Sequence, residues 1–380
     1  MHARSKTRET VNSIMGSKKV DINIKAIARE LFSERDVKMI RLALSPVIKQ
    51  SELDSVVDGW DAATAPFNSQ IIAFNLAKNH PEVSFPKEIQ PILQQAAILS
   101  RKRHLEILPH FSKVIKVLEN KEIPFILIKG GAMRAYRPER PRWTADIDIL
   151  VPEEKYEEAL KDTEKLGYIL HRSPHSSGLR ELSSDQDFVD IHHYVSMDTG
   201  KERNLNDPLF GRTLSLPFSA STVRVPCPED MVFISLVNFW KNVTHISREN
   251  SKISFANLCF DLIFLRDRDG CLDWDIIRTD AEITGSVEVV YLATSLLDNI
   301  LPGFFPERFL EAEVDFRMVK RLMSRTLFTR NVLSPLRDKI GEFNIKKATS
   351  QKRNPFKYIY LRVLYFIVKR FPAGGFKTKG

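Results

Sequence analysis

Three aspartates in the middle of the chain have the spacing expected of ligands for divalent cations. In the segment ADIDILV, acidic and apolar residues alternate with a period of two, which places Asp146 and Asp148 on one face of a predicted strand. Asp190 follows in the apolar strand candidate DFVDIHHYV, where an unpaired carboxylate would be costly to bury. Hard cations such as Mg²⁺ prefer carboxylate oxygens. Asp146, Asp148 and Asp190 are therefore the predicted catalytic residues and the predicted ligands of Mg²⁺ or Mn²⁺.

A second group of residues suits a bound phosphate chain. The apolar run FILIK ends at Gly130 and Gly131, and AMRAY after it favours the start of a helix. Glycines let the backbone approach a ligand closely, and the free N–H groups of a helix N-terminus bind phosphate. Lys129 and Arg142 add cationic groups, and His192 shares a strand face with the third aspartate, where it could contact a phosphate, a base or that acid. The predicted nucleotide-binding residues are Lys129, Gly130, Gly131, Arg142 and His192.

Each motif also has an ordinary structural explanation. An Asp-x-Asp pair is common at a solvated strand end, and His192 could serve only as a hydrogen-bonding histidine within the fold. The order of the motifs favours a function, because strand, glycine pair, helix, Asp-x-Asp strand and a later Asp strand together supply what two-metal phosphoryl transfer needs. Further along, Lys241, His245 and Lys252 are candidates to close over a nucleotide, and Asp261 is a candidate buried partner for one of these cations.

The elements that must position these residues form a mixed fold. Apolar spacings of three and four predict helices from residue 21 to about residue 120 and again beyond residue 226, whereas short apolar strands lie between them. The fold class is therefore α+β, with a small sheet flanked by helical regions. We predict an N-terminal helical region at 1–120, a core at 121–226, a C-terminal helical domain at 227–345 and a basic, aromatic-rich tail at 346–380.

Composition limits where the chain acts and what it binds. The net charge is +9, but residues 346–380 hold ten of the 57 basic residues and none of the 48 acidic ones. The nearly neutral body carries no strong nucleic-acid signal. Cys227, Cys259 and Cys271 are widely spaced and lie beside apolar residues, which favours reduced thiols and a cytoplasmic location. We find no secretory signal and no apolar stretch long enough to span a bilayer.

The tail has three interpretations. Residues 356–371 mix aromatic and aliphatic side chains with flanking lysines and arginines. This composition is typical of a peripheral contact with the inner membrane surface. A final core helix with a basic end fits equally well, and an RNA attachment fits less well.

The stretch from Phe125 to Tyr194 resembles a known family. The segments ILIKGGAM, RWTADIDILV, EEALKDTEKLGY and VDIHH are similar, in that order, to the uncharacterised nucleotidyltransferase family of the DNA polymerase β superfamily. A weaker similarity covers residues 90–305. The resemblance implies a polymerase β-type core, a two-metal mechanism, and transfer of a nucleoside monophosphate from a nucleoside triphosphate with release of pyrophosphate. It carries over to Gly130, Gly131, Asp146, Asp148 and Asp190, and it assigns no acceptor.

Three functions remain open on the sequence. An enzyme could use a small molecule, a glycan precursor, tRNA or a protein as its acceptor. A toxin-type nucleotidyltransferase acting on tRNA or protein shows a similar KGG segment followed by RxTxDID. A catalytically silent nucleotide-binding scaffold, tethered near a membrane by its tail, is the alternative outside the enzymes, although three retained carboxylates speak against a decayed site.

Overall fold

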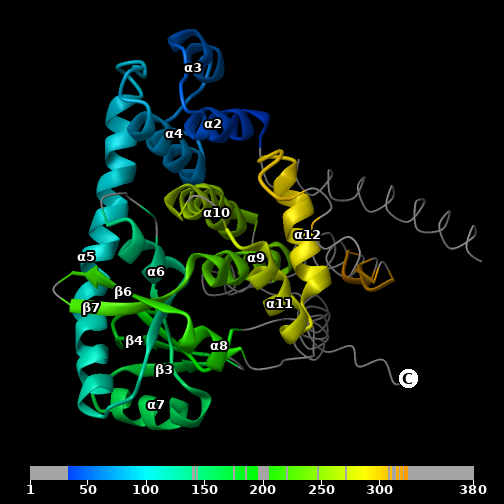
Figure 1. The fold of residues 1–380 in the computed structure, drawn as a ribbon. Helices are drawn as coiled ribbons and strands as arrows, with labels where there is room; N and C mark the ends of the chain where they lie inside the picture. The colour runs from blue at the N-terminus through cyan, green and yellow to red at the C-terminus, as the bar shows by residue number, and fades with distance from the viewer. Residues whose placement is uncertain are drawn as a thin grey trace, which may run out of the picture.

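The computed structural model describes most of residues 33–323 (Figure 1). Within that span it leaves out residues 139–141, 143, 174–175, 185, 196–204, 220, 246–247, 270–271, 307–308, 310–313, 316 and 320. The predicted tail at 346–380, its proposed contact segment at 356–371 and the helix expected near residue 21 therefore lie outside the described residues. Cys227 and Cys259 are free thiols, as expected, and Cys271 is not described.

Four helices precede the sheet in the part of the chain that the structure describes. They are α2 (Glu34–Leu44), α3 (Gln50–Val57), α4 (Phe67–Asn79) and α5 (Gln90–Asn120). Ser33 begins α2 with a capping box, in which its hydroxyl and the Asp36 carboxylate each accept a backbone N–H of the other residue. Helix α5 has 31 residues, and it packs against α4 near one end and against α7 (Tyr156–Glu164) and the sheet toward the other (Figure 1). It therefore joins the N-terminal helices to the part of the chain that carries the acids.

A five-stranded mixed sheet forms the centre of the core. Its strands lie in the order β1 (Ile126–Ile128), β2 (Ile147–Leu150), β5 (Val189–His192), β4 (Ser176–Arg180) and β3 (Ile169–Arg172). Strands β2 and β5 are parallel, and the other neighbouring pairs are antiparallel. The last strand of the sheet along the chain, β5, is thus inserted at its centre, between β2 and β4.

A two-stranded hairpin was not expected from the sequence. It consists of β6 (Thr213–Phe218) and β7 (Ser221–Pro226), and β7 lies beside β1. The short helix α8 (Asn206–Gly211) precedes it.

Four named helices follow the hairpin among the described residues up to Asp298. They are α9 (Pro228–His245), α10 (Arg248–Asp269), α11 (Trp274–Thr284) and α12 (Val287–Asp298). Helix α9 begins with a proline and two acids, as a helix N-terminus favours, and it packs against the other three. Arg212 joins α9 to α11, because its Nη2 donates to Asp230 at 2.6 Å and to Asp280 at 2.8 Å. The expected α+β class, a small mixed sheet with helical regions before and after it, is confirmed.

The C-terminal helices also touch the N-terminal ones. Helix α10 packs on α4 and α2, and Arg41 of α2 donates to the carbonyls of Asn299 and Ile300 just after α12. The buried apolar side chains form one continuous cluster that includes residues from all these regions. In the part of the chain that the structure describes, no helix has the length and apolar character needed to cross a membrane.

Candidate active site

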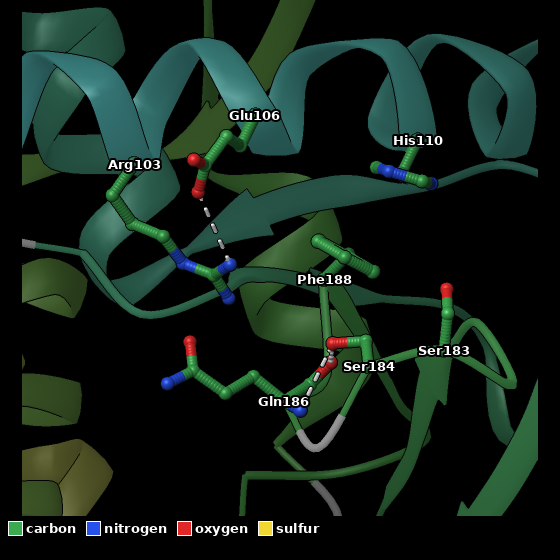
Figure 2. A pocket seen from close by; sticks show the side chains of 7 residues that line it. All are labelled: Arg103, Glu106, His110, Ser183, Ser184, Gln186 and Phe188. Atoms are coloured by element: carbon green, nitrogen blue, oxygen red, sulfur yellow. Dashed lines mark hydrogen bonds and ion pairs between the residues drawn. The ribbon is translucent and has the colours of Figure 1, made fainter.

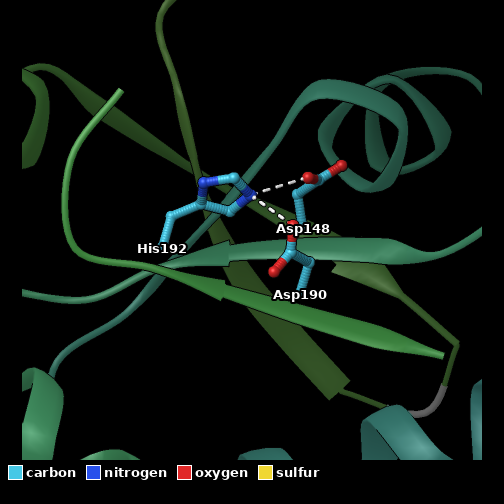
Figure 3. A group of neighbouring side chains, drawn as sticks. All are labelled: Asp148, Asp190 and His192. Atoms are coloured by element: carbon cyan, nitrogen blue, oxygen red, sulfur yellow. Dashed lines mark hydrogen bonds and ion pairs between the residues drawn. The ribbon is translucent and has the colours of Figure 1, made fainter. Parts of the chain in front are cut away.

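The register of two strands brings a pair of predicted acids together. Asp148 on β2 lies opposite Asp190 on β5, and His192 follows two positions later on the same strand. The Nε2 atom of His192 lies 2.8 Å from Asp148 Oδ1 and 3.2 Å from Asp190 Oδ2 (Figure 3). Among the described residues, these three form a group whose ligand atoms all lie within 4.8 Å of one another. We call Asp148, Asp190 and His192 the acid–histidine cluster.

Two neighbours complete the polar contacts of the cluster. Lys129, the first residue of α6 (Lys129–Tyr136), places its Nζ 2.6 Å from Asp148 Oδ1 and 3.2 Å from His192 Nε2. Ser176 of β4 donates its hydroxyl to Asp190 Oδ2 at 3.1 Å. The other carboxylate oxygen of Asp190, Oδ1, is buried and accepts no hydrogen bond from the described residues. One strong acceptor of the cluster is therefore available to a further ligand.

The charges of the cluster stabilise one another. Burial alone would raise the pKa of Asp148, but Lys129 and His192 outweigh it and hold that pKa well below its usual range. Burial also opposes ionisation of Asp190, and contact with His192 lowers the pKa of Asp190 nevertheless. For His192, burial and Lys129 act to lower the pKa, whereas Asp190 and Asp148 raise it on balance. The cluster thus holds two carboxylates in their ionised form in a nearly closed site.

Asp146 occupies a different position from the other two predicted acids. It precedes β2 by one residue, is half-buried, and does not belong to the acid–histidine cluster. It is still close enough to interact electrostatically with Asp148 and Asp190. Burial, followed by repulsion from Asp148 and Asp190, raises the pKa of Asp146 to about 7. The structure therefore separates a firm pair, Asp148 and Asp190, from a third acid at the edge of the site.

The glycine pair lies within α6 rather than in a turn ahead of it. Lys129 has a φ of 50° and begins α6, so Gly130 and Gly131 occupy the first helical turn. A Cβ atom on Gly130 would lie 2.7 Å from Arg142 Nη1 and 2.9 Å from Thr144 Cγ2. The glycines were predicted to lie ahead of the helix, and that placement was wrong because α6 already begins at Lys129. The approach of a ligand to the glycines stays a prediction.

Arg142 contacts a carboxylate of the C-terminal helical region. Its Nε donates to Asp261 Oδ2 at 3.0 Å and its Nη2 to the same oxygen at 2.8 Å. Asp261 was expected to pair with Lys241, His245 or Lys252, but it pairs with Arg142 of the loop before β2. The side chains of His245 and Lys252 are outside the described residues. The role of Lys241 in closing over a nucleotide stays a prediction.

A buried arginine that the sequence analysis missed supports the strands that carry the acids. Arg103 of α5 donates from Nε to the carbonyl of Ala145 at 2.9 Å and from Nη2 to the carbonyl of Asp187 at 3.0 Å. These carbonyls stand just before β2 and β5. The guanidinium also lies 5.2 Å from the centre of the Phe188 ring. One side chain thus links α5 to the starts of both strands.

The same arginine lines a shallow pocket of about 480 Å³ between α5 and the loop that joins β4 to β5 (Figure 2). His110 of α5 stacks on Phe188 in this pocket, with ring centres 3.9 Å apart, and Glu106 lies 3.8 Å from Arg103. Lys129, Asp148 and His192 do not line it. The pocket therefore lies beside the strand starts and apart from the acid–histidine cluster.

The cluster fits a divalent cation. It offers two ionised carboxylates and one imidazole within a small volume, and Asp190 contributes a buried oxygen that lacks a donor among the described residues. A cation would satisfy that oxygen. The imidazole adds a ligand that transition metals such as Mn²⁺ accept more readily than Mg²⁺ does. The donor set is therefore compatible with either of the expected ions.

Comparisons with known proteins point to one family. No curated protein matches the chain. One solved structure similar to part of it is the solution structure of the antibiotic-resistance factor ANT(2'')-Ia, with 14% sequence identity and a TM-score of 0.30; the match covers 44% of this chain and 91% of that one. The family model described as "uncharacterised nucleotidyltransferase" matches residues 64–302. That span includes the whole acid–histidine cluster, Lys129 and the glycine pair. The chain belongs to the uncharacterised nucleotidyltransferase family.

Proposed function

We propose that the protein is a metal-dependent nucleotidyltransferase, which transfers a nucleoside monophosphate from a nucleoside triphosphate to an acceptor and releases pyrophosphate. The observation that supports this most directly is the pairing of Asp148 with Asp190 across adjacent strands, with a buried oxygen of Asp190 left for a cation. The first turn of α6, which contains Gly130 and Gly131, follows β1, and β1 pairs with β2. A cation site and a phosphate site therefore adjoin each other.

The acid–histidine cluster would hold the cation. A bound divalent ion supplies neutralisation of phosphate oxygens and activation of the attacking oxygen. Asp148 and Asp190 would supply carboxylates for one ion, and Asp146 at the edge of the site would supply a carboxylate for a second ion. The hard oxygen ligands favour Mg²⁺ or Mn²⁺.

The proposed reaction forms one bond and breaks another. The acceptor oxygen forms a bond to the α-phosphorus, and the bond between that phosphorus and the oxygen leading to the β-phosphate breaks. Pyrophosphate leaves with the electron pair of the broken bond. Asp190 would orient an acceptor hydroxyl, and the proton of that hydroxyl passes to solvent water. The backbone N–H groups of Gly130 and Gly131 bind the phosphate chain while these bonds exchange.

Lys129 connects the two halves of the site. Its ammonium contacts Asp148, and the residue itself begins α6, just before Gly130 and Gly131. Lysine binds phosphate as a flexible point charge, so a small rotation of the side chain moves its charge from the carboxylate to a phosphate oxygen. His192 contacts both carboxylates, and we assign it to the cation site or to the phosphate beside it.

The test is a transfer assay with the four labelled nucleoside triphosphates and either Mg²⁺ or Mn²⁺. Small hydroxyl compounds, glycan precursors, tRNA and protein are offered as acceptors. We expect one combination to label an acceptor or the protein itself, and Asp148→Ala to abolish the label. Asp187→Asn is the matched control, because its carboxylate lies 3.5 Å from His171 and outside the cluster. Equal labelling by wild type and Asp148→Ala would exclude the proposed reaction at this site.

A further inference from the structure

The loop before β2 is held in place from two directions. Arg134 of α6 is buried and donates from Nη2 to the carbonyl of Arg142. Its Nε lies 3.4 Å from the hydroxyl of Thr144. Because Arg134 binds the backbone carbonyl of Arg142, the side chain of Arg142 leaves the loop from a defined point.

The side chain of Arg142 is in turn fixed by Asp261. The carboxylate accepts hydrogen bonds from Nε and Nη2, which form one edge of the guanidinium. The remaining amino group, Nη1, lies 3.5 Å from Thr144 Oγ1 and next to the position of a Cβ atom on Gly130. Asp261 therefore binds the guanidinium edge formed by Nε and Nη2, and Nη1 remains beside Gly130 of α6.

This arrangement is buried and specific. The Asp261 side chain is 9% exposed and that of Arg142 is 19% exposed. Two charges removed from water are stable only when their geometry is good, and a two-bond contact to one edge of a guanidinium meets that condition. Helix α10 also makes a cation–π contact, since Arg137 just after α6 lies 4.1 Å from the ring centre of Phe264. Two arginines from the phosphate side of the site thus dock on one helix.

We propose that Asp261 is a positioning residue, which acts through Arg142 and holds Nη1 of that arginine against the N-terminus of α6 as a contact for a phosphate group of the nucleotide. This inference rests on the proposed function. It makes α10 of the C-terminal helical region a part of the nucleotide site, although α10 itself need not touch the nucleotide. An arginine without such a partner would sample many rotamers, whereas Asp261 fixes the orientation of the Arg142 side chain before a phosphate binds.

The experiment measures binding of inorganic tripolyphosphate to the full chain by calorimetry, with and without Mg²⁺. We expect Arg142→Gln and Asp261→Asn each to weaken binding by about tenfold or more. The double variant should bind no more weakly than Arg142→Gln alone, because Asp261 acts only through that arginine. Asp261→Glu should restore part of the affinity. Arg142→Lys keeps the charge but loses the two-bond contact, so it should also bind more weakly than wild type.

The matched control is Asp280→Asn, which disrupts another buried aspartate–arginine pair, that of Asp280 with Arg212. It should lower the melting temperature and leave tripolyphosphate affinity unchanged. The inference is overturned if wild type does not bind tripolyphosphate, if Asp261→Asn leaves binding unchanged, if it weakens binding equally in the Arg142→Gln background, or if Asp280→Asn weakens it as much. If Asp261→Asn does not fold, the comparison of Asp261→Glu and Arg142→Lys with wild type decides, and unchanged binding by both overturns the inference.

Failure of this inference differs from failure of the proposed function. A wild-type protein that transfers nucleotides while Asp261→Asn binds tripolyphosphate normally contradicts the positioning role alone. A wild-type protein that binds tripolyphosphate through Arg142 and Asp261, but labels no acceptor, contradicts the proposed reaction alone.

Discussion

Asp148 and Asp190 lie directly opposite each other on adjacent parallel strands, and one nitrogen of His192 contacts both carboxylates. Asp148 also pairs with Lys129, whereas Asp190 keeps one buried oxygen without a donor among the described residues. The two acids are therefore not equivalent. The charge of Asp148 is already balanced by Lys129, whereas Asp190 has a buried oxygen that an added cation could bind.

Metal binding should separate the three acids. We expect Asp148→Asn and Asp190→Asn each to weaken Mn²⁺ binding by about tenfold or more, because each removes an ionised ligand from the cluster. Asp146→Asn should have a smaller effect, since Asp146 lies outside the cluster. Isothermal titration with Mn²⁺ measures all three, and Asp187→Asn serves as the control. A larger loss for Asp146→Asn than for Asp190→Asn would contradict this ranking.

Arg103 should matter for stability more than its place on a surface helix indicates. Arg103→Met leaves the carbonyls of Ala145 and Asp187 without their buried donor, so the free energy of unfolding should fall by about 2–3 kcal/mol. Urea unfolding measures the change. Lys102→Met is the control on the same helix, because the Lys102 side chain is 72% exposed, and it should change stability by less than about 0.5 kcal/mol. Similar losses for both variants would show that the carbonyl contacts contribute little.

The glycines should rank by the space around them. A Cβ atom at Gly130 would lie 2.7 Å from Arg142 Nη1, one at Gly131 would lie 3.1 Å from Ile147 Cγ2, and one at Gly211 would have nothing within 4 Å. Gly130→Ala should therefore lower stability by about 1–3 kcal/mol and weaken tripolyphosphate binding, because Arg142 must move. Gly131→Ala should cost less, and Gly211→Ala should leave binding unchanged. Thermal unfolding and calorimetry test the order, which fails if Gly211→Ala matches Gly130→Ala.

His104 should make stability depend on pH. Burial and the nearby charge of Arg134 lower the pKa of His104 to about 4, from an ordinary value of 6.5. As the pH falls from 6.5 toward 4, the unfolded chain takes up a proton at this residue and the folded chain does not. The contribution of neutral His104 is thus fully present above pH 6.5 and is lost toward pH 4, by up to about 3 kcal/mol.

The measurement for His104 is a difference between two proteins. His104→Phe keeps an aromatic ring beside Phe218, which His104 meets edge-on at 6.1 Å, but it cannot take up a proton. Urea unfolding at several pH values should show wild type losing stability relative to this variant as the solution becomes more acidic. A difference that stays constant between pH 7 and pH 4 would rule out the proposed titration.

Strand periodicity predicted the faces of the acids but not their partners. The alternation around Asp148 and Asp190 correctly placed His192 on the same face as Asp190. The pairing of β2 with β5 depends on contacts between distant parts of the chain, which a local pattern does not contain. For Asp146 the pattern was less informative, because β2 begins at Ile147 and a residue at a strand end is less constrained than one inside it.

The partners of two arginines, Arg103 and Arg142, could not be predicted from the sequence. Arg103 lies in the buried stripe of α5 that also contains Ser100 and Ile107, so its burial was readable from the spacing. Its partners are backbone carbonyls, which no side-chain pattern reveals. Arg142 lies 119 positions from Asp261, whereas the candidate partners for Asp261 had been sought near it in the sequence.

The β6–β7 hairpin was missed for a different reason. Its strands contain Pro217 and Pro226 together with several polar residues, and proline lowers the expectation of a strand. Strand preference depends strongly on the surface against which a segment packs. Here that surface is provided by β1, which precedes the hairpin by a long stretch of chain. The hairpin therefore depends on its neighbour more than on its own composition.

The central position of β5 has a consequence for the newly made protein. During synthesis β1, β2, β3 and β4 leave the ribosome before β5, yet β2 and β4 have their common neighbour only when β5 enters between them. Closing this long-range contact costs chain entropy, so it is expected to be a late step in folding. A growing chain that ends before residue 190 lacks Asp190 and His192, two of the three residues of the acid–histidine cluster. Incomplete or prematurely released chains should therefore lack the proposed transferase activity, which would require β5 to be in place between β2 and β4.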